Sequence, residues 1–182
     1  ETLKRHWILE LKEVDLLRHG DEDDVMDDQV WEALLKSIKE GYWHGTVGTP
    51  PCNSFSRVLY ANNDGPQPVR SRAFPYGFPW LFGKDKARCV MGNVLAYRSL
   101  EAFKVGHRSA ACTPYLLEHP EDLGVTRNGD EPASLFRWED TVNLIKETAA
   151  TQGALYQCRY PGNTSSKPTR LVGTFKKLGK PC

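Results

Sequence analysis

Residues 43–56 are Trp43-His44-Gly45-Thr46-Val47-Gly48-Thr49-Pro50-Pro51-Cys52-Asn53-Ser54-Phe55-Ser56. The part from Trp43 to Val47 predicts a short strand, and the glycine and prolines after it end that strand. Cys52 therefore comes directly after a strand. In α/β folds, ligands bind beyond the carboxyl ends of the strands. This position makes Cys52 a candidate nucleophile, although a lone cysteine is more often an inert core residue.

The rest of the chain alternates between strand-like and helix-like patterns. Strands are expected over 7–14, 43–47, 112–117, 156–160 and 169–175, and helices over 28–40, 85–107 and 138–149. Asp27 or Asp28 caps the first helix, Gly41 ends it, and Gly153 closes the last. Such alternation predicts an α/β fold with a Rossmann-like, mostly parallel sheet that carries helices on both faces.

One long segment, 53–83, has neither periodicity. It is rich in proline and glycine, and it carries several aromatic residues, among them Phe74, Tyr76, Phe78 and Trp80. Loops of this length are uncommon in compact domains unless they are functional or disordered. Because it begins at the candidate nucleophile, we expect it to be a functional loop that closes over the site.

Size and composition predict one domain spanning residues 1–182. Hydrophobic residues make up 40% of the chain and charged residues 26%, and no apolar run approaches the roughly 18 residues of a membrane helix. The cysteine count of 5 is odd, and no Cys-x-x-Cys pair is present, so neither a disulfide framework nor a metal site is predicted. These features favour a reducing, intracellular compartment, with the nucleus as one option.

The charges are sorted along the chain although the net charge is only +1. Residues 10–32 are strongly acidic, whereas 153–182 contain no acidic residue and several basic ones. The basic segments flank Cys52 and the later strands. Sorting of this kind favours a nucleic-acid partner, and the alternative is a solvated surface with uneven charge.

Two later segments, Leu116-Leu117-Glu118-His119-Pro120 and Tyr156-Gln157-Cys158-Arg159-Tyr160, complete a pattern with the Cys52 loop. Over about residues 45–175, the chain resembles the cytosine-5 DNA methyltransferases, in which a Pro-Cys-Gln-x-Phe-Ser loop, a Glu-Asn-Val turn and a Gln-x-Arg-x-Arg strand follow in this order. Asn53, His119-Pro120 and Pro161 depart from that pattern. The glycine loop of the family is not found in residues 1–50, so the resemblance implies a fold that is incomplete at its N-terminus.

The resemblance implies a role for each matching residue. Cys52 would add to C6 of cytosine, and a protonated Glu118 would hydrogen-bond N3. Arg159 would hold the O2 carbonyl and Gln157 would brace the loop, while Arg57 or Arg159 would supply a cation for the thiolate. S-adenosylmethionine would be the cofactor, with Glu13 or Asp15 on its ribose. The residues expected to contact nucleic acid are Arg57, Arg70, Arg72, Lys167 and Arg170.

These expectations leave several functions open. The first is methyl transfer to C5 of cytosine, on DNA or, less favoured, on RNA. The second is a degenerate methyltransferase fold that acts as a non-catalytic nucleic-acid-binding or assembly subunit, which the absent glycine loop favours. The third is a different thiol-dependent enzyme on an α/β scaffold. Another chain or a missing N-terminal segment would complete the cofactor site in the first case.

Overall fold

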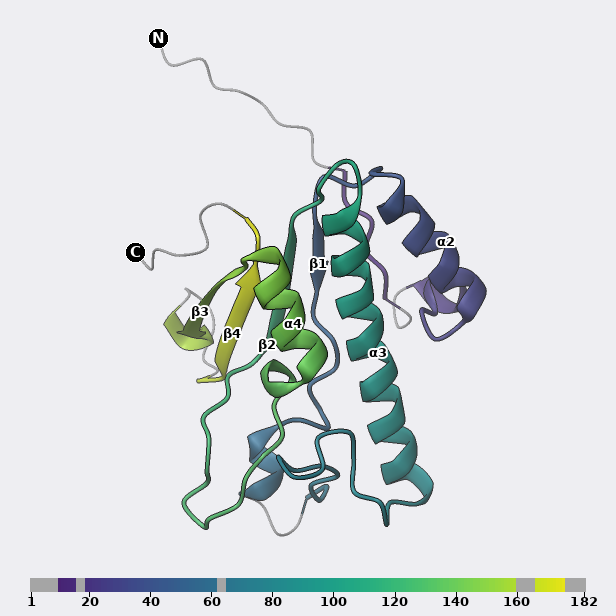
Figure 1. Ribbon diagram of the computed structural model, residues 1–182. Coiled ribbons are helices and arrows are strands. Elements are labelled where there is room, and N and C mark those ends of the chain that lie inside the picture. Colours follow the sequence, from purple (N-terminus) through teal and green to yellow (C-terminus); the bar gives the residue numbers. More distant parts are fainter. Residues whose placement is uncertain (1–9, 16–18, 62–64, 160–165, 176–182) are drawn as a thin grey trace.

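The computed structural model describes residues 10–15, 19–61, 65–159 and 166–175 (Figure 1). Its helices and strands follow one another along the chain as α2 (Asp28–Lys39), β1 (Thr46–Gly48), α3 (Gly83–Arg108), β2 (Tyr115–Pro120), α4 (Glu139–Thr148), β3 (Thr151–Tyr156) and β4 (Pro168–Gly173). Short 3-10 helices lie at η1 (Gly20–Asp23), η2 (Arg57–Tyr60), η3 (Leu135–Arg137) and η4 (Gln157–Arg159). None of the helices in these residues is both long and apolar enough to span a bilayer.

The four strands form a mixed sheet in the order β1-β2-β4-β3. β1 and β2 are parallel, with Val47 opposite Leu116. β4 runs antiparallel to both β2 and β3. The predicted α/β class is therefore confirmed, but the described strands do not form the mostly parallel sheet that was expected. The connection between β3 and β4 contains only the 3-10 helix η4 among its described residues, and neighbouring strands joined without a crossover helix run antiparallel.

The main core lies on one face of the sheet. Tyr115 and Leu117 of β2 and Val172 of β4 point to this face, where they pack against Phe103 of α3 and Leu144 of α4. Figure 1 shows α3 and α4 together in front of the strands. α2 packs on α3 through a second cluster and not on the sheet. Within the described residues, the expectation of helices on both faces is wrong, because both core helices share one face.

The predicted helices are found close to their expected positions. The Asp27 side chain caps α2 by accepting hydrogen bonds from the backbone N–H groups of Gln29 and Val30. Gly41, with a φ of 75°, follows the end of that helix. α3 extends the predicted helix by a turn or less at each end. The positions of all three predicted helices are thus confirmed, although the residues that α3 buries, such as Cys89, Ala96 and Phe103, do not include Val90 and Met91.

The boundaries after α4 differ from the prediction. Ala149 ends α4 in the left-handed conformation, with a φ of 49°, and Gly153 lies inside β3 instead of closing the helix. β3 therefore begins several residues earlier than predicted, and Gln157 to Arg159 form a 3-10 helix in place of a strand. At the other end of the chain, residues 10–15 have no regular secondary structure, and the rest of the strand predicted over 7–14 lies outside the described residues.

Replacement of Ala149 by glycine is expected to stabilise the fold. Glycine relieves the steric cost of the left-handed conformation, so Ala149→Gly should raise the free energy of unfolding by about 0.5 to 1 kcal/mol after the entropy of the unfolded chain is subtracted. Urea denaturation measures this change. Ala87→Gly, at an exposed position inside α3, is the control and should lower the same quantity by about 1 kcal/mol. If both substitutions changed the free energy of unfolding in the same direction, the left-handed conformation of Ala149 would be contradicted.

Candidate active site

A cavity of about 610 Å³ lies beyond the carboxyl ends of the parallel strands β1 and β2. Its walls come from four segments of the chain, around 52–61, 119–124, 132–134 and 166–168. Cys52 contributes to it from the loop after β1, and His119 and Pro120 from the last residues of β2. The two parts of the sequence pattern, the Cys52 loop and the Glu118 turn, therefore meet at one edge of the sheet.

The Cys52 loop is held in place by local hydrogen bonds. The Cys52 carbonyl oxygen accepts from the N–H of Phe55 at 3.0 Å, which closes a turn. The Ser56 hydroxyl then caps η2 by accepting from the N–H of Val58. Cys52 itself is partly buried, whereas Ser54 and Phe55 are buried. The loop thus directs its serine and phenylalanine inward and leaves the thiol on the wall of the cavity.

A buried arginine fastens this loop to the rest of the fold. Arg70 is 1% exposed, and one Nη donates to Ser54 Oγ at 3.0 Å and to the Cys89 carbonyl at 3.1 Å. The other Nη donates to the Pro75 carbonyl and to Asn93 Oδ1. Its Cζ also lies 3.9 Å from the centre of the Phe55 ring. Arg70 therefore joins the loop, the 70–78 segment and α3 through a single side chain.

The burial of Arg70 changes its expected role. Removal of the guanidinium from water lowers its pKa from the ordinary value. The group nonetheless keeps its charge, because arginine is so basic, and carbonyl oxygens and an aromatic ring take the place of water. The phosphate contact predicted for Arg70 requires a guanidinium at the surface. Since the structure places this one inside, Arg70 is assigned to the framework of the site.

Close contact between α3 and the loop depends on Gly92. A Cβ atom at this position would lie 2.7 Å from Ser54 Oγ and 3.4 Å from an Nη of Arg70. Such distances are shorter than ordinary van der Waals contact for the hydroxyl, so any side chain at position 92 would displace Ser54 or Arg70. Gly92 is buried in the middle of α3, where alanine would otherwise be the better helix former.

Glu118 does not line the cavity, whereas its neighbour His119 does. Successive residues of a strand point to opposite faces, and Glu118 lies on the face away from the core. Its carboxylate accepts a hydrogen bond from Lys167 Nζ at 3.3 Å. Lys167 in turn lines the cavity. Lys167 is therefore a residue of the cavity wall whose ammonium group is paired with the Glu118 carboxylate.

His119 is the site residue that the sequence pattern did not single out. It is 1% exposed, and neither ring nitrogen has a hydrogen-bond partner among the described residues. Its ring makes edge-to-face contacts with Phe55 at 4.8 Å and with Phe136 at 6.0 Å. Burial, with the nearby charges of Lys167 and Arg70, lowers the pKa of His119 from 6.5 to about 3. His119 is therefore a neutral imidazole in the cavity wall at physiological pH.

Gln157 supports the cavity wall from the side of β4. Its Nε2 donates to Thr169 Oγ1 at 3.2 Å, and its backbone N–H donates to the carbonyl of Lys167 at 3.2 Å. These two bonds fix the segment 167–169, which includes wall residues. These contacts are with β4 and the residue before it, whereas the bracing role expected for Gln157 concerns the Cys52 loop. Arg159 ends the 3-10 helix η4, and its side chain lies outside the described part of the structure.

The other predicted phosphate ligands already have partners in the fold. The Arg57 guanidinium, on the cavity wall, donates to the carbonyls of Gly124 and Val125 at 2.8 Å each. Arg170 donates hydrogen bonds from Nε and from one Nη to the Glu121 carboxylate, at 3.0 and 2.6 Å. Arg72 forms an ion pair with Glu131 at 3.4 Å. Arg72 is half-exposed and is the most accessible of the three to a phosphate.

Glu13 and Asp15, the residues expected to hold a cofactor ribose, belong to the irregular segment 10–15. Neither lines the Cys52 cavity, and neither lines the second cavity of about 470 Å³ beside α2. The strand that would have placed a carboxylate at the sheet edge is not formed over these residues. For metal ions, no group of three or more His, Cys, Asp or Glu side chains comes together within the described ranges.

Removal of the buried guanidinium is expected to destabilise the fold strongly. Arg70→Met leaves several buried acceptors without a donor, so the free energy of unfolding should fall by about 3 kcal/mol or more. Arg72→Met removes only an exposed ion pair and should change it by less than about 1 kcal/mol. Urea denaturation of both variants tests the difference. A similar loss for both would mean that Arg70 is not the anchor of the loop.

The neutral imidazole of His119 predicts a pH dependence of stability. The unfolded chain takes up a proton near pH 6.5, whereas the folded chain does so only near pH 3. As pH falls below 6.5, the His119 contribution should therefore lower the free energy of unfolding by up to about 1.4 kcal/mol per pH unit. His119→Asn should lose this slope between pH 6.5 and 4.5.

The matched control is His44→Asn, which changes an exposed histidine and should keep the slope of the unmodified protein. Thermal unfolding at several pH values, followed by circular dichroism, provides the measurement. If His119→Asn and the unmodified protein lose stability in parallel on acidification, His119 is not buried in its neutral form.

Comparison with known proteins gives no relative for this chain: no family model, curated protein or solved structure matches it.

Proposed function

We propose that the cavity binds a cytosine base and that Cys52 adds to C6 of that base, as the first step of methyl transfer to C5 in DNA. The observation that carries the proposal is the placement of Cys52, His119 and Lys167 around one cavity, although they come from distant parts of the chain. RNA is the second choice of substrate. The parallel β1 and β2 pair, with the thiol beyond its carboxyl ends, supplies the part of a Rossmann-like site that this role needs.

The size and walls of the cavity suit a planar base. Its volume of about 610 Å³ lies within the usual range for small-ligand sites. Phe55, Val58, Leu123 and Pro132 provide apolar surface, and Lys167 provides a cation. A base inside a duplex would have to leave the stack to reach such a pocket, or the strand would have to be single.

The chemistry of addition can be assigned to the residues of the wall. A bond forms between the thiolate sulfur and C6, and the electron pair of the C5–C6 double bond moves to C5 and into the ring. The Lys167 ammonium group would stabilise the negative charge that develops on the ring. Reversal breaks the sulfur–C6 bond and restores the thiolate. Because the thiol must stay reduced, we place the protein in a reducing compartment.

In this proposal, Glu118 acts on the base only through Lys167. The ion pair between them restrains the side chain of Lys167, which is a residue of the cavity wall. Direct protonation of N3 by Glu118, which the resemblance implies, would require its side chain to turn from the outer face of the sheet. Lys167 is therefore the residue that we assign to charge stabilisation, with Glu118 positioning it.

The methyl donor is the part of the activity that the described residues do not support. S-adenosylmethionine is the cofactor that the resemblance implies, but Glu13 and Asp15 do not fit a site for it, since neither lines either cavity. Complete methylation would need residues beyond the described part or a second chain.

The lack of fit between Glu13, Asp15 and a cofactor site favours a second candidate function. A methyltransferase-like domain that binds nucleic acid without carrying out methyl transfer would keep the base pocket and would need no cofactor site. Such a binding or assembly subunit should retain affinity for the base while Cys52 makes no covalent bond. The two functions differ in one measurable respect, the formation of an adduct.

Covalent addition can be tested without any cofactor. An oligonucleotide that carries 2-pyrimidinone in place of one cytosine offers an electron-poor C6, so a thiolate can add to it without methyl transfer. We expect the full chain to form a 1:1 adduct, seen as a mass increase equal to that of the oligonucleotide. The adduct should disappear in Cys52→Ala.

Cys112→Ala is the control, because Cys112 is an exposed thiol that does not line the cavity, and its adduct yield should equal that of the unmodified protein. Lys167→Met should lower the rate of adduct formation about tenfold or more if its charge stabilises the ring. Tight binding of the oligonucleotide with no adduct would reject the nucleophile and leave the non-catalytic function. If the adduct still formed in Cys52→Ala, the assignment of Cys52 as nucleophile and of Lys167 as the stabilising charge would both be rejected.

A further inference from the structure

Four aromatic residues of the segment before α3 form a surface that the base pocket does not use. We name it the aromatic shelf and define it as Phe74, Phe78, Trp80 and Phe82. Phe78 and Trp80 are stacked, with centroids 4.8 Å apart and planes within 7°. The Phe74 ring contacts both edge-on, at 5.9 and 5.7 Å. Mutual contacts of this kind hold three of the rings in a fixed arrangement.

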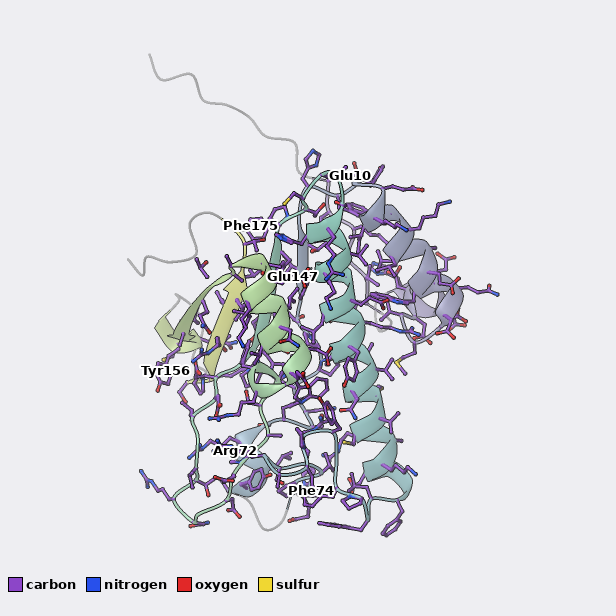
Figure 2. All side chains as sticks on the ribbon, in the orientation of Figure 1. Glu10, Arg72, Phe74, Glu147, Tyr156 and Phe175 are labelled. Carbon is purple, nitrogen blue, oxygen red and sulfur yellow. The ribbon has the colours of Figure 1, made fainter. Side chains whose placement is uncertain are left out.

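The shelf faces solvent although it is apolar. Phe74 is 41% exposed, Trp80 is 64% exposed and Phe82 is 84% exposed. Figure 2 shows Phe74 and Arg72 at the end of the molecule where α3 begins. Single exposed aromatic residues are ordinary, but a contiguous group of them marks an interaction surface. Their rings offer flat faces, which suit a partner that is itself planar.

The charge around the shelf is positive. Lys84 and Lys86 follow Phe82 directly on the first turn of α3, and both are exposed. Within the described residues, neither lysine forms an ion pair, whereas the acid between them, Asp85, binds Arg88 at 3.0 Å. Two uncompensated ammonium groups next to stacked rings complement a polyanion with planar groups.

The shelf is coupled to the Cys52 loop through Arg70. This side chain binds the Pro75 carbonyl inside the aromatic segment and Ser54 inside the loop. The backbone of the same segment is pinned by a hydrogen bond from the Phe78 N–H to the Val69 carbonyl at 3.0 Å. The two surfaces therefore keep a fixed relative position, as parts of one binding site would need.

We propose that the aromatic shelf binds the bases of single-stranded nucleic acid by stacking, with Lys84 and Lys86 beside the phosphates. Stacking on aromatic side chains next to cations is how proteins bind single strands without regard to sequence. In a duplex each base is stacked on its neighbours along the helix, so its flat faces are not available to the shelf. The inference extends the proposed function, since it identifies a single strand as the form of nucleic acid that reaches the base pocket.

The test measures non-covalent binding with a ligand that is not the base proposed for addition of Cys52. Fluorescein-labelled dT15 contains no cytosine, and its anisotropy on titration with the full 182-residue chain gives a dissociation constant. We expect Trp80→Ala to weaken binding about tenfold or more. The double variant Lys84→Ala/Lys86→Ala should reduce the slope of log affinity against log salt by about 1.4, or about 0.7 for each lost phosphate contact.

Two control variants separate the shelf from other effects. Tyr42→Ala removes a similarly exposed aromatic residue, 61% exposed, outside the shelf and should leave the affinity unchanged. Cys52→Ala should also bind dT15 normally even though it forms no adduct, so failure of the nucleophile and failure of the shelf give different results. Circular dichroism and the melting temperature of Trp80→Ala establish that it is folded.

Three results would overturn the inference. The first is dT15 binding that is unaffected by Trp80→Ala, and the second is the absence of binding at low salt. The third is a duplex that binds more tightly than dT15 and competes with it. A shelf that instead recognises a protein would give the second result.

Discussion

The site depends on one buried positive charge. Arg70 is buried, and its two Nη groups donate to two carbonyl oxygens, a hydroxyl and an amide oxygen, while its Cζ lies over the Phe55 ring and its Nε has no partner among the described residues. An ion removed from water is costly unless its donors are satisfied, so the acceptors must stay where they are while the protein is folded. Those acceptors belong to the Cys52 loop, the aromatic segment and α3. A single electrostatic requirement thus fixes two largely irregular segments, the Cys52 loop and the aromatic segment, against helix α3.

The contacts of Arg70 matter because the sheet itself gives the site little support. β1 contains only Thr46–Gly48, and the core helices cover one face of the sheet. The cavity walls consist largely of loops, which are usually the most mobile parts of a domain. Arg70 on one side, and the contacts of Gln157 with the 167–169 segment on the other, reduce that mobility. Cys52 and Lys167 therefore lie in loops that are individually anchored, and His119 lies in strand β2.

Sequence patterns were sufficient for the features that depend on local periodicity. All three helices, the caps at Asp27 and Gly41, and the meeting of the Cys52 loop with the end of β2 followed from the sequence. The start of β3 did not, because Ala149 adopts a conformation that glycine usually occupies, and only the tertiary structure makes it do so. The sequence also marked Arg70 as a surface cation, since the identity of a residue does not reveal its burial. Whether Glu118 or His119 faces the cavity depends on the strand register, and a change of one residue reverses it.

The contact between Gly92 and Ser54 limits how this protein can vary. On an isolated helix, alanine at position 92 would be favoured over glycine by about 1 kcal/mol. Here the first carbon of any side chain would meet the hydroxyl that Arg70 holds. The amino acid permitted in the middle of α3 is therefore decided by the geometry of a loop nearly forty positions earlier in the chain. Substitution of Gly92 is therefore limited by the position of Ser54 in the Cys52 loop, so a residue in the middle of α3 depends on the geometry of the candidate site.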